Sequence, residues 1–320
     1  MSQEIQETRK KISFRRNFIN ILLVVVIGIS SGLFLGSWYS YNMLASSADY
    51  SGLDANLLTE DVSVVIGRSL NIRKVNDDQR KNWVSLAKSK GITPKKISGG
   101  DNTQLAIDVI NNASSWTAIG TGKVETIVTQ TVYSAKYYDG STYAFESISK
   151  GIVNVATIAV YGKDNTDVTT IVGNDIKETS ASWNGKSEKM TTEAYVDKNG
   201  GLPSNAIPYI ISSQTVINSS DITESEVDGK KLYSYTIALH PLKSVVNYIK
   251  QVKQTSGLSD YPTFNDITID VVIDENWNFV KFNIVENYRV VYSGLKPKCK
   301  GVLNIDFTVN QPVTLPEYKD

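Results

Sequence analysis

The chain of 320 residues has very few of the side chains that most often build metal and acid–base sites. It contains one cysteine, Cys299, and one histidine, His240. A single cysteine cannot form an internal disulfide, and sites made of several cysteines or histidines are excluded by count. We therefore expect no metal site, no cofactor and no catalytic residue, and an enzyme is the least favoured class of function.

The sequence also lacks an excess of either charge. Lys and Arg together number 33, Asp and Glu together number 33, and the formal net charge is zero. Proteins that bind nucleic acid usually present a basic face to the phosphate backbone. The balance of charges gives no basis for such a face, so we expect no nucleic-acid partner.

One long stretch near the N-terminus has no charged residue at all. It reads FINILLVVVIGISSGLFLGSWY and runs from Phe18 to Tyr39. A run of about 20 apolar residues is long enough to cross the hydrocarbon core of a bilayer as a helix, and aromatic residues gather where such a helix meets water. Trp38, Tyr39 and Tyr41 stand at its end. We predict a transmembrane helix over residues 18–41, with the membrane as its partner.

The charges beside this stretch indicate its orientation. Five basic residues precede it within the tail 1–17, and the next Lys or Arg is Arg68. Basic residues stay on the cytoplasmic side, so we predict a single-pass protein of the cell membrane with a cytoplasmic tail and everything after Tyr41 outside. Small residues at Ala45–Ala48 leave a second possibility open, a signal peptide that is cleaved there.

The outer part divides into two predicted regions. Residues 42–100 are expected to form a stalk or small helical element, with a helix beginning at Asn76 or Asp77 and ending at Gly91. Residues 101–320 are expected to form a β-rich extracytoplasmic domain that opens with a helix at Asp101. Beyond Trp116 the pattern changes to period-two alternation with turn signals at Asp139–Gly140 and Asp228–Gly229.

This alternation predicts about nine or ten antiparallel strands. The expected strands cover residues 117–128, 129–138, 141–149, 152–161, 167–172, 187–196, 230–239, 267–292 (a hairpin of two strands) and 300–309. So large a sheet curls, and its apolar face needs a cover. The fold class is therefore α+β and β-dominated: a large curved antiparallel sheet, forming a half-open barrel covered by a few helices.

Two helices are expected within this domain. One is a short helix in residues 204–217, near Pro208. The clearer one runs from Pro241 to Gln254, with an apolar stripe of Leu242, Val245, Val246, Ile249 and Val252. We expect the second helix to cover the apolar face of the sheet.

The order of elements resembles the LolA-like lipoprotein carriers and cell-wall-side proteins of Gram-positive bacteria. It consists of a helix, a long antiparallel meander, and the segment HPLKSVVNYIKQVKQTSGLSDYPTF between strands, and it covers residues 99–309. The resemblance implies a half-open barrel around helices that hold a lipid chain. The chain departs from the family by having an apolar anchor where the carriers have a lipidated cysteine or a cleaved signal. A tethered protein can bind, present or sense, but cannot shuttle.

The motifs that could carry other chemistry all have simpler explanations. GTGK at Gly120–Lys123 lacks the first glycine of a phosphate-binding loop and lies in a strand pattern, where two glycines indicate a bulge. His240 precedes Pro241 and is expected to be buried or to cap a helix. Cys299 lies among Lys296, Lys298 and Lys300, which would favour a thiolate, but a simple hairpin thiol is the favoured interpretation.

The sequence thus leaves two functions. The first is a membrane-anchored extracytoplasmic binding module for a lipid or other apolar ligand of the cell envelope. Its expected cleft lies between helix and sheet and is lined by Val245, Val246, Ile249, Val252, Tyr133 and Tyr143. The alternative is a sensory or structural ectodomain that binds a protein partner and has no ligand cavity.

Overall fold

A computed structural model describes most of the chain beyond residue 82. The described residues are 83–89, 91–126, 129–151, 155–163, 166–173, 186–199, 202–212, 215–246, 248–249, 260–291 and 295–318. The predicted tail 1–17 and span 18–41 lie outside these ranges. None of the helices that the structure describes has the length and apolar content that a membrane crossing needs.

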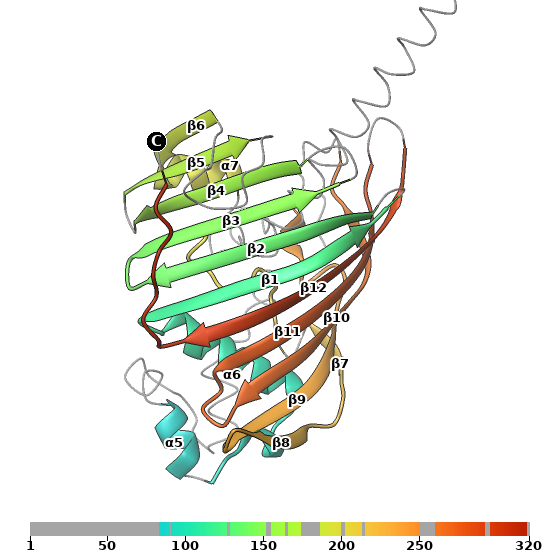
Figure 1. Cartoon of the computed structure of the whole chain (residues 1–320). Coiled ribbons are helices and arrows are strands. Elements are labelled where there is room, and N and C mark those ends of the chain that lie inside the picture. The colour runs from blue at the N-terminus through green and yellow to red at the C-terminus, as the bar shows by residue number, and fades with distance from the viewer. Residues whose placement is uncertain are drawn as a thin grey trace, which may run out of the picture.

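A 12-stranded antiparallel sheet dominates the described part of the chain (Figure 1). Its strands are β1 (Ser115–Glu125), β2 (Thr129–Asp139), β3 (Thr142–Lys150), β4 (Val155–Lys163), β5 (Asp167–Gly173), β6 (Lys186–Thr191), β7 (Val216–Ser219), β8 (Thr223–Val227), β9 (Lys230–Leu239), β10 (Thr263–Asp274), β11 (Phe279–Arg289) and β12 (Lys298–Val309). The helices are α5 (Trp83–Ser89), the short 3₁₀ helix η3 (Pro94–Lys96), α6 (Gly99–Asn111) and α7 (Thr192–Asn199).

The strand order shows how the sheet is assembled. It runs β6-β5-β4-β3-β2-β1-β12-β11-β10-β9-β7, and β8 also pairs with β9. The last strand, β12, therefore lies between β1 and β11 and joins the two halves of the sheet. The ends at β6 and β7 do not pair, so the sheet is curved but not closed (Figure 1). The prediction of a β-dominated antiparallel architecture is confirmed.

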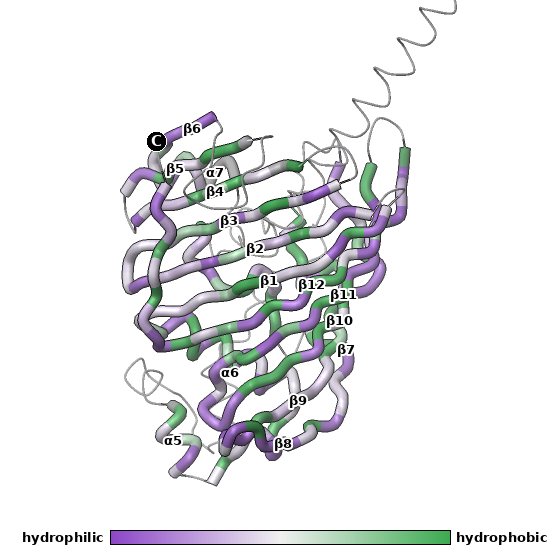
Figure 2. Tube along the Cα trace, in the orientation of Figure 1, coloured by the Kyte–Doolittle hydropathy of each residue, from purple (hydrophilic) through white to green (hydrophobic). Residues whose placement is uncertain are grey.

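The two faces of the sheet follow from the register, because successive side chains of a strand point to opposite faces. We call the face that carries Trp116, Phe145, Ile269 and Phe282 the inner face, since these side chains lie in the main core. The opposite face, which carries Thr121 and its register partner Tyr133, is the outer face. Figure 2 shows the hydrophobic and hydrophilic residues that alternate along β9 to β12.

Helix α6 packs against the inner face. Its N-cap is Ser98, whose hydroxyl accepts a hydrogen bond from the Asp101 N–H at 3.1 Å. The buried Thr103 hydroxyl lies 3.0 Å from the Tyr235 hydroxyl on β9, and Asn102 accepts a hydrogen bond from the Trp277 indole at 2.7 Å. These polar contacts fix the helix on a surface that is otherwise apolar, and the helix predicted from Asp101 is confirmed with an earlier start.

The glycines of β1 permit close approach rather than forming the expected bulge. Both ladders of β1 keep a regular register across Gly120 and Gly122. A Cβ on Gly122 would lie 2.1 Å from the Val302 carbonyl oxygen and 2.9 Å from the Leu303 Cα. Any larger residue there would push β12 away from β1, so the bulge prediction is wrong and the glycine serves strand packing.

Two predicted elements differ in the structure. The described part of 204–217 holds no helix, and its end forms β7. Pro208 has no N–H, and the Ile210 N–H donates instead to the Ser244 carbonyl at 2.9 Å. The strand expected over 187–196 ends at Thr191, whose hydroxyl accepts from the Ala194 N–H at 3.2 Å and so caps α7.

The predicted helix from Pro241 to Gln254 is described only up to Ile249. The Ser244 N–H donates to the His240 carbonyl, and the Ile249 N–H donates to the Val245 carbonyl at 2.9 Å, which is helical spacing. Val245, Val246 and Ile249 are buried, but Leu242 is 44% exposed and does not belong to the buried stripe.

Candidate functional site

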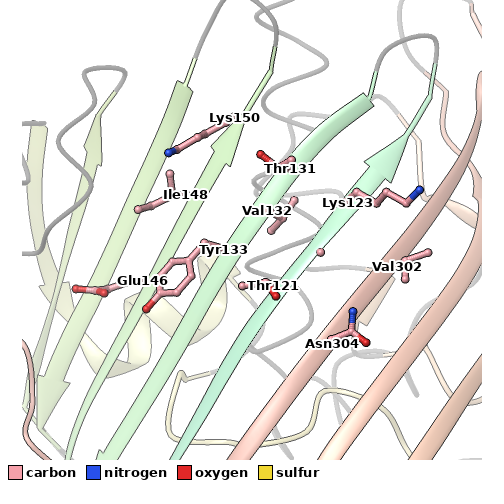
Figure 3. A pocket seen from close by; sticks show the side chains of 11 residues that line it. Thr121, Lys123, Thr131, Val132, Tyr133, Glu146, Ile148, Lys150, Val302 and Asn304 are labelled. Carbon is pink, nitrogen blue, oxygen red and sulfur yellow. The ribbon is translucent and has the colours of Figure 1, made fainter.

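A pocket of about 720 Å³ lies on the outer face, across four adjacent strands (Figure 3). The lining residues are Thr121, Gly122 and Lys123 of β1, Thr131, Val132 and Tyr133 of β2, Glu146, Ile148 and Lys150 of β3, and Val302 and Asn304 of β12. Ligand sites for small molecules usually measure about 300–1,000 Å³. The pocket is therefore large enough to hold a small organic ligand.

Strand register arranges the lining into rows across the sheet. The first row holds Val302, Lys123, Thr131 and Lys150, each the partner of the next. The second row, two residues further along, holds Asn304, Thr121, Tyr133 and Ile148. The third row contains Glu146. The pocket thus has a cationic end, a centre with an aromatic ring and an aliphatic side chain, and a carboxyl end.

Backbone geometry sets how far apart the backbones of these charged residues lie. Neighbouring strands are about 4.8 Å apart, so the backbones of Lys123 and Lys150 lie roughly 10 Å apart across β2. Lys150 and Glu146 are four residues apart on β3, which is about 13 Å along the strand. Lys123 also forms an ion pair with Glu125 at 2.5 Å on the same face. This end of the pocket therefore carries two lysine side chains, on the strands that flank β2, and the ammonium group of Lys123 is already paired with Glu125.

The carboxyl end of the pocket is buried. Glu146 is 6% exposed, and the hydroxyl of Tyr318 donates to its Oε1 at 3.1 Å. Burial raises the pKa of Glu146, while the hydrogen bond from Tyr318 acts in the opposite direction. The Tyr318 ring stacks on Tyr161 with centroids 4.6 Å apart. Glu146 is thus shared between the pocket and the C-terminal tail.

A second buried carboxyl lies on the inner face. Glu286 of β11 accepts a hydrogen bond from the Tyr209 hydroxyl on Oε1 and one from the Tyr248 hydroxyl on Oε2, the latter at 3.2 Å. Burial raises its pKa to about 7, against the effect of both hydrogen bonds. Because Tyr209 and Tyr248 come from different segments, the carboxyl joins both of them to the sheet.

The residues of the expected cleft are divided between the two faces. Tyr143, Val245 and Ile249 are part of the main core, and Val246 is also buried. Tyr133 lies on the outer face and lines the pocket, whereas Tyr143 is on the inner face. Val252 lies outside the described residues. Of the six, the structure therefore brings only Tyr133 to the pocket.

The lysines and Glu146 were missed because their proximity depends on the pairing of β3 with β2 and β2 with β1. Lys123 and Lys150 are 27 positions apart in the sequence, and no local pattern joins them. A signal was available in the turns, since the Asp139–Gly140 hairpin fixes the register of β2 against β3. Counting back from that turn places Lys150 opposite Thr131.

The other motifs keep structural roles. The His240 imidazole Nδ1 accepts from the backbone N–H of Leu242 at 3.2 Å and of Lys243 at 3.3 Å, which confirms the capping prediction. Cys299 is buried on the inner face, and burial raises the pKa of its thiol to about 11, so its neighbouring lysines produce no reactive thiolate. Among the described residues, no three His, Cys, Asp or Glu side chains are placed to hold a metal ion.

Comparison with known proteins gives distant structural matches. No protein-family model matches the chain, and no curated protein matches it. LprF of Mycobacterium bovis is 13% identical, with a TM-score of 0.34 over 68% of this chain and 95% of its own. A LolA superfamily protein of Nitrosomonas europaea is 8% identical, with a TM-score of 0.21 over 68% and 96%. A porin-like protein of Bacteroides uniformis is 12% identical, with a TM-score of 0.21 over 62% and 97%. All three TM-scores lie below 0.5, so they do not establish a shared fold.

Proposed function

We propose that this chain is a binding module for an amphipathic ligand that carries an anionic group, and that the ligand occupies the outer-face pocket. The observation that carries the proposal is the order of the rows in the pocket. Lys123 and Lys150 lie at one end, and Tyr133 and Ile148 lie next to them. An acid group at the lysines would leave an apolar chain on the aromatic and aliphatic side chains.

The ligand class follows from this order of side chains. Ammonium groups bind carboxylate or phosphate through charge-assisted hydrogen bonds. Apolar ligand surface gains about 25 cal/mol for each Å² that is removed from water. A fatty acid or a lipid with an acidic headgroup presents both features in one molecule. Its acid group is next to its apolar chain, as the row with the two lysines is next to the row with Tyr133 and Ile148. The lipid ligand expected from the sequence thus moves from the inner face to the outer face.

Filling the pocket tests the proposal. Thr121 is exposed at the centre of the pocket, so Thr121→Trp places an indole there without disturbing the core. We expect a dansyl-labelled fatty acid to bind the full chain, and to bind this variant at least about tenfold more weakly. The measurement is a fluorescence titration.

This test has a matched control, and a second variant with its own control tests the lysine end of the pocket. Thr308→Trp adds the same side chain at an exposed outer-face position of β12 outside the pocket, and should leave binding unchanged. Lys150→Gln should weaken binding by about tenfold, whereas Lys281→Gln on β11 should not. Equal binding by the wild type and Thr121→Trp would contradict the proposal.

The membrane anchor is part of the same proposal. The uncharged run 18–41 and the basic residues before it support a single-pass anchor with the sheet outside the cell. Such an anchor would hold the pocket beside the lipid bilayer. Protease treatment of intact cells tests this arrangement. The other function expected from the sequence, a partner-binding ectodomain without a cavity, stays a prediction, and the pocket favours the ligand-binding module.

A further inference from the structure

The C-terminal tail, residues 310–318, crosses the outer face of the sheet. It leaves β12 and runs over the strands on the face toward the viewer, ending beside β6 (Figure 1). At its start the Asn310 N–H donates to the Ser115 carbonyl at 2.8 Å, and the Ser115 hydroxyl donates to the Gln311 carbonyl at 2.8 Å. These bonds hold the beginning of the tail on β1.

At the other end of the tail, Tyr318 attaches the chain to the sheet. Its ring stacks on Tyr161 at an interplanar angle of 16°, and its hydroxyl reaches the Glu146 carboxyl. Tyr318, Tyr161 and Tyr133 also pack against a second apolar cluster, separate from the main core, made of Ile148, Val155, Ala159 and Ile171. Ile148, Tyr133 and Glu146 line the pocket as well. The docked tail and the pocket therefore share Glu146, and Tyr318 packs against the same apolar cluster to which the pocket residues Tyr133 and Ile148 belong.

From this overlap we infer that the C-terminal tail is an intramolecular competitor of the ligand, with Tyr318 closing the Glu146 end of the pocket. The inference rests on the proposed function, because it describes the regulation of the same pocket. When Tyr318 leaves, the Glu146 carboxyl and the face of the Tyr161 ring become available as an extension of the pocket. The apolar end of a ligand that reaches past Ile148 then takes the place of the Tyr318 ring on Tyr161 and on the second apolar cluster.

The two ends of the tail are attached separately, so Tyr318 can leave the pocket and be replaced by a ligand. The tail residues Gln311, Pro312, Thr314 and Glu317 are exposed, Val313, Leu315 and Pro316 are half-buried, and the hydrogen bonds and the ring stack named above lie at Asn310–Gln311 and at Tyr318. The end can therefore be released while the beginning stays attached to β1. Release breaks the hydrogen bond of Tyr318 to Glu146 and its stack on Tyr161, and it removes the ring from the second apolar cluster, so a bound ligand has to replace these contacts.

Removing the tyrosine side chain tests the inference in the full chain. We expect Tyr318→Ala to bind the dansyl-labelled fatty acid about tenfold more tightly than the wild type, because the ligand no longer has to displace the ring. Tyr318→Phe keeps the stack and loses the hydroxyl, so its affinity should lie between the two. Thr314→Ala changes an exposed position of the same tail and should leave the affinity unchanged.

The outcomes separate the inference from the proposed function. If the wild type binds the probe, Thr121→Trp weakens binding and Tyr318→Ala has the wild-type affinity or a lower one, the inference is wrong and the proposed function stands. If Tyr318→Ala binds the probe while the wild type does not, competition by the tail is supported in its strongest form. If neither binds the probe, the proposed function is rejected, and the inference is rejected with it.

Discussion

At the scale of single residues, Glu286 is the clearest departure from the pattern of the sheet. It lies between Ile284 and Tyr288 on the inner face of β11, points into the core and is 1% exposed. The titratable groups around it are Tyr209, Tyr248 and Tyr288, whose own pKa values are all raised by burial. A buried carboxyl among neutral phenols favours its protonated form, since the charged form loses water without gaining a cation.

The raised pKa of Glu286 makes stability depend on pH. Between the ordinary carboxyl pKa of 4.5 and the folded value of about 7, the folded state binds more protons than the unfolded state. The free energy of unfolding should therefore be highest below about pH 4.5 for this group and fall by roughly 3 kcal/mol as pH rises through about 7. The raised pKa of Glu146 acts in the same direction.

Urea unfolding at about pH 5 and about pH 8 measures this effect. We expect Glu286→Gln to lose most of the difference between the two conditions, because glutamine has no proton to release. Glu226→Gln alters an exposed residue of β8 and should keep the wild-type difference. A wild type that is as stable at the higher pH as at the lower one would show that Glu286 does not titrate in this range.

At the scale of elements, the long strands could be predicted and the short ones could not. In β10 the buried Ile267, Ile269, Val271 and Ile273 alternate with half-buried or exposed residues, which is a strong period-two signal. Strand β8 is exposed along its whole length, so burial imposed no pattern on its sequence. This strand was therefore not predicted from the sequence. Likewise, α7 was predicted as strand because Thr191 and Thr192 favour both strands and helix starts.

Strand β12 is the element on which the whole sheet depends. It pairs with β1 on one side and with β11 on the other, so it alone joins β1–β6 to β7–β11 within the described sheet. A chain that ends at Pro297 lacks both ladders and exposes the inner-face partners of Leu303, Ile305 and Phe307. We expect this truncated chain not to fold, and to show no cooperative unfolding transition by circular dichroism.

The matched control for this truncation ends at Pro312. It keeps β12 and its bonds to Ser115 but loses the tail beyond residue 312. We expect it to unfold cooperatively, within about 2 kcal/mol of the full chain, because both ladders of β12 are kept and only the contacts of residues 313–318, chiefly those of Tyr318, are lost. A cooperative transition in the chain that ends at Pro297 would show that one half of the sheet folds without the other.

At the scale of the whole molecule, the sequence indicates the sheet and its apolar cover more readily than the site. The inner face could be predicted because burial alternates along the long strands β9 to β12. The outer-face pocket could not, because Val302, Lys123, Thr131 and Lys150 meet only when β12, β1, β2 and β3 align. The buried Glu286 was hidden for the same reason, since its donors Tyr209 and Tyr248 lie 77 and 38 positions away.

The proposed anchor implies one orientation of the chain in the membrane, which an experiment can measure. Residues 1–48 carry five basic and two acidic residues, which leaves +3 on that part and −3 on the rest of a neutral chain. Under this proposal, the positive-inside rule would place the sheet, the pocket and the tail outside the membrane. We expect protease added to intact cells to digest everything after residue 46 and to spare a tag at the N-terminus.

Cleavage at Ala45–Ala48 would instead give a mature chain that starts near Asp49 and is released from the membrane fraction. Protection of the C-terminal domain in intact cells, with digestion only after lysis, would reverse the orientation and remove the pocket from the outer surface.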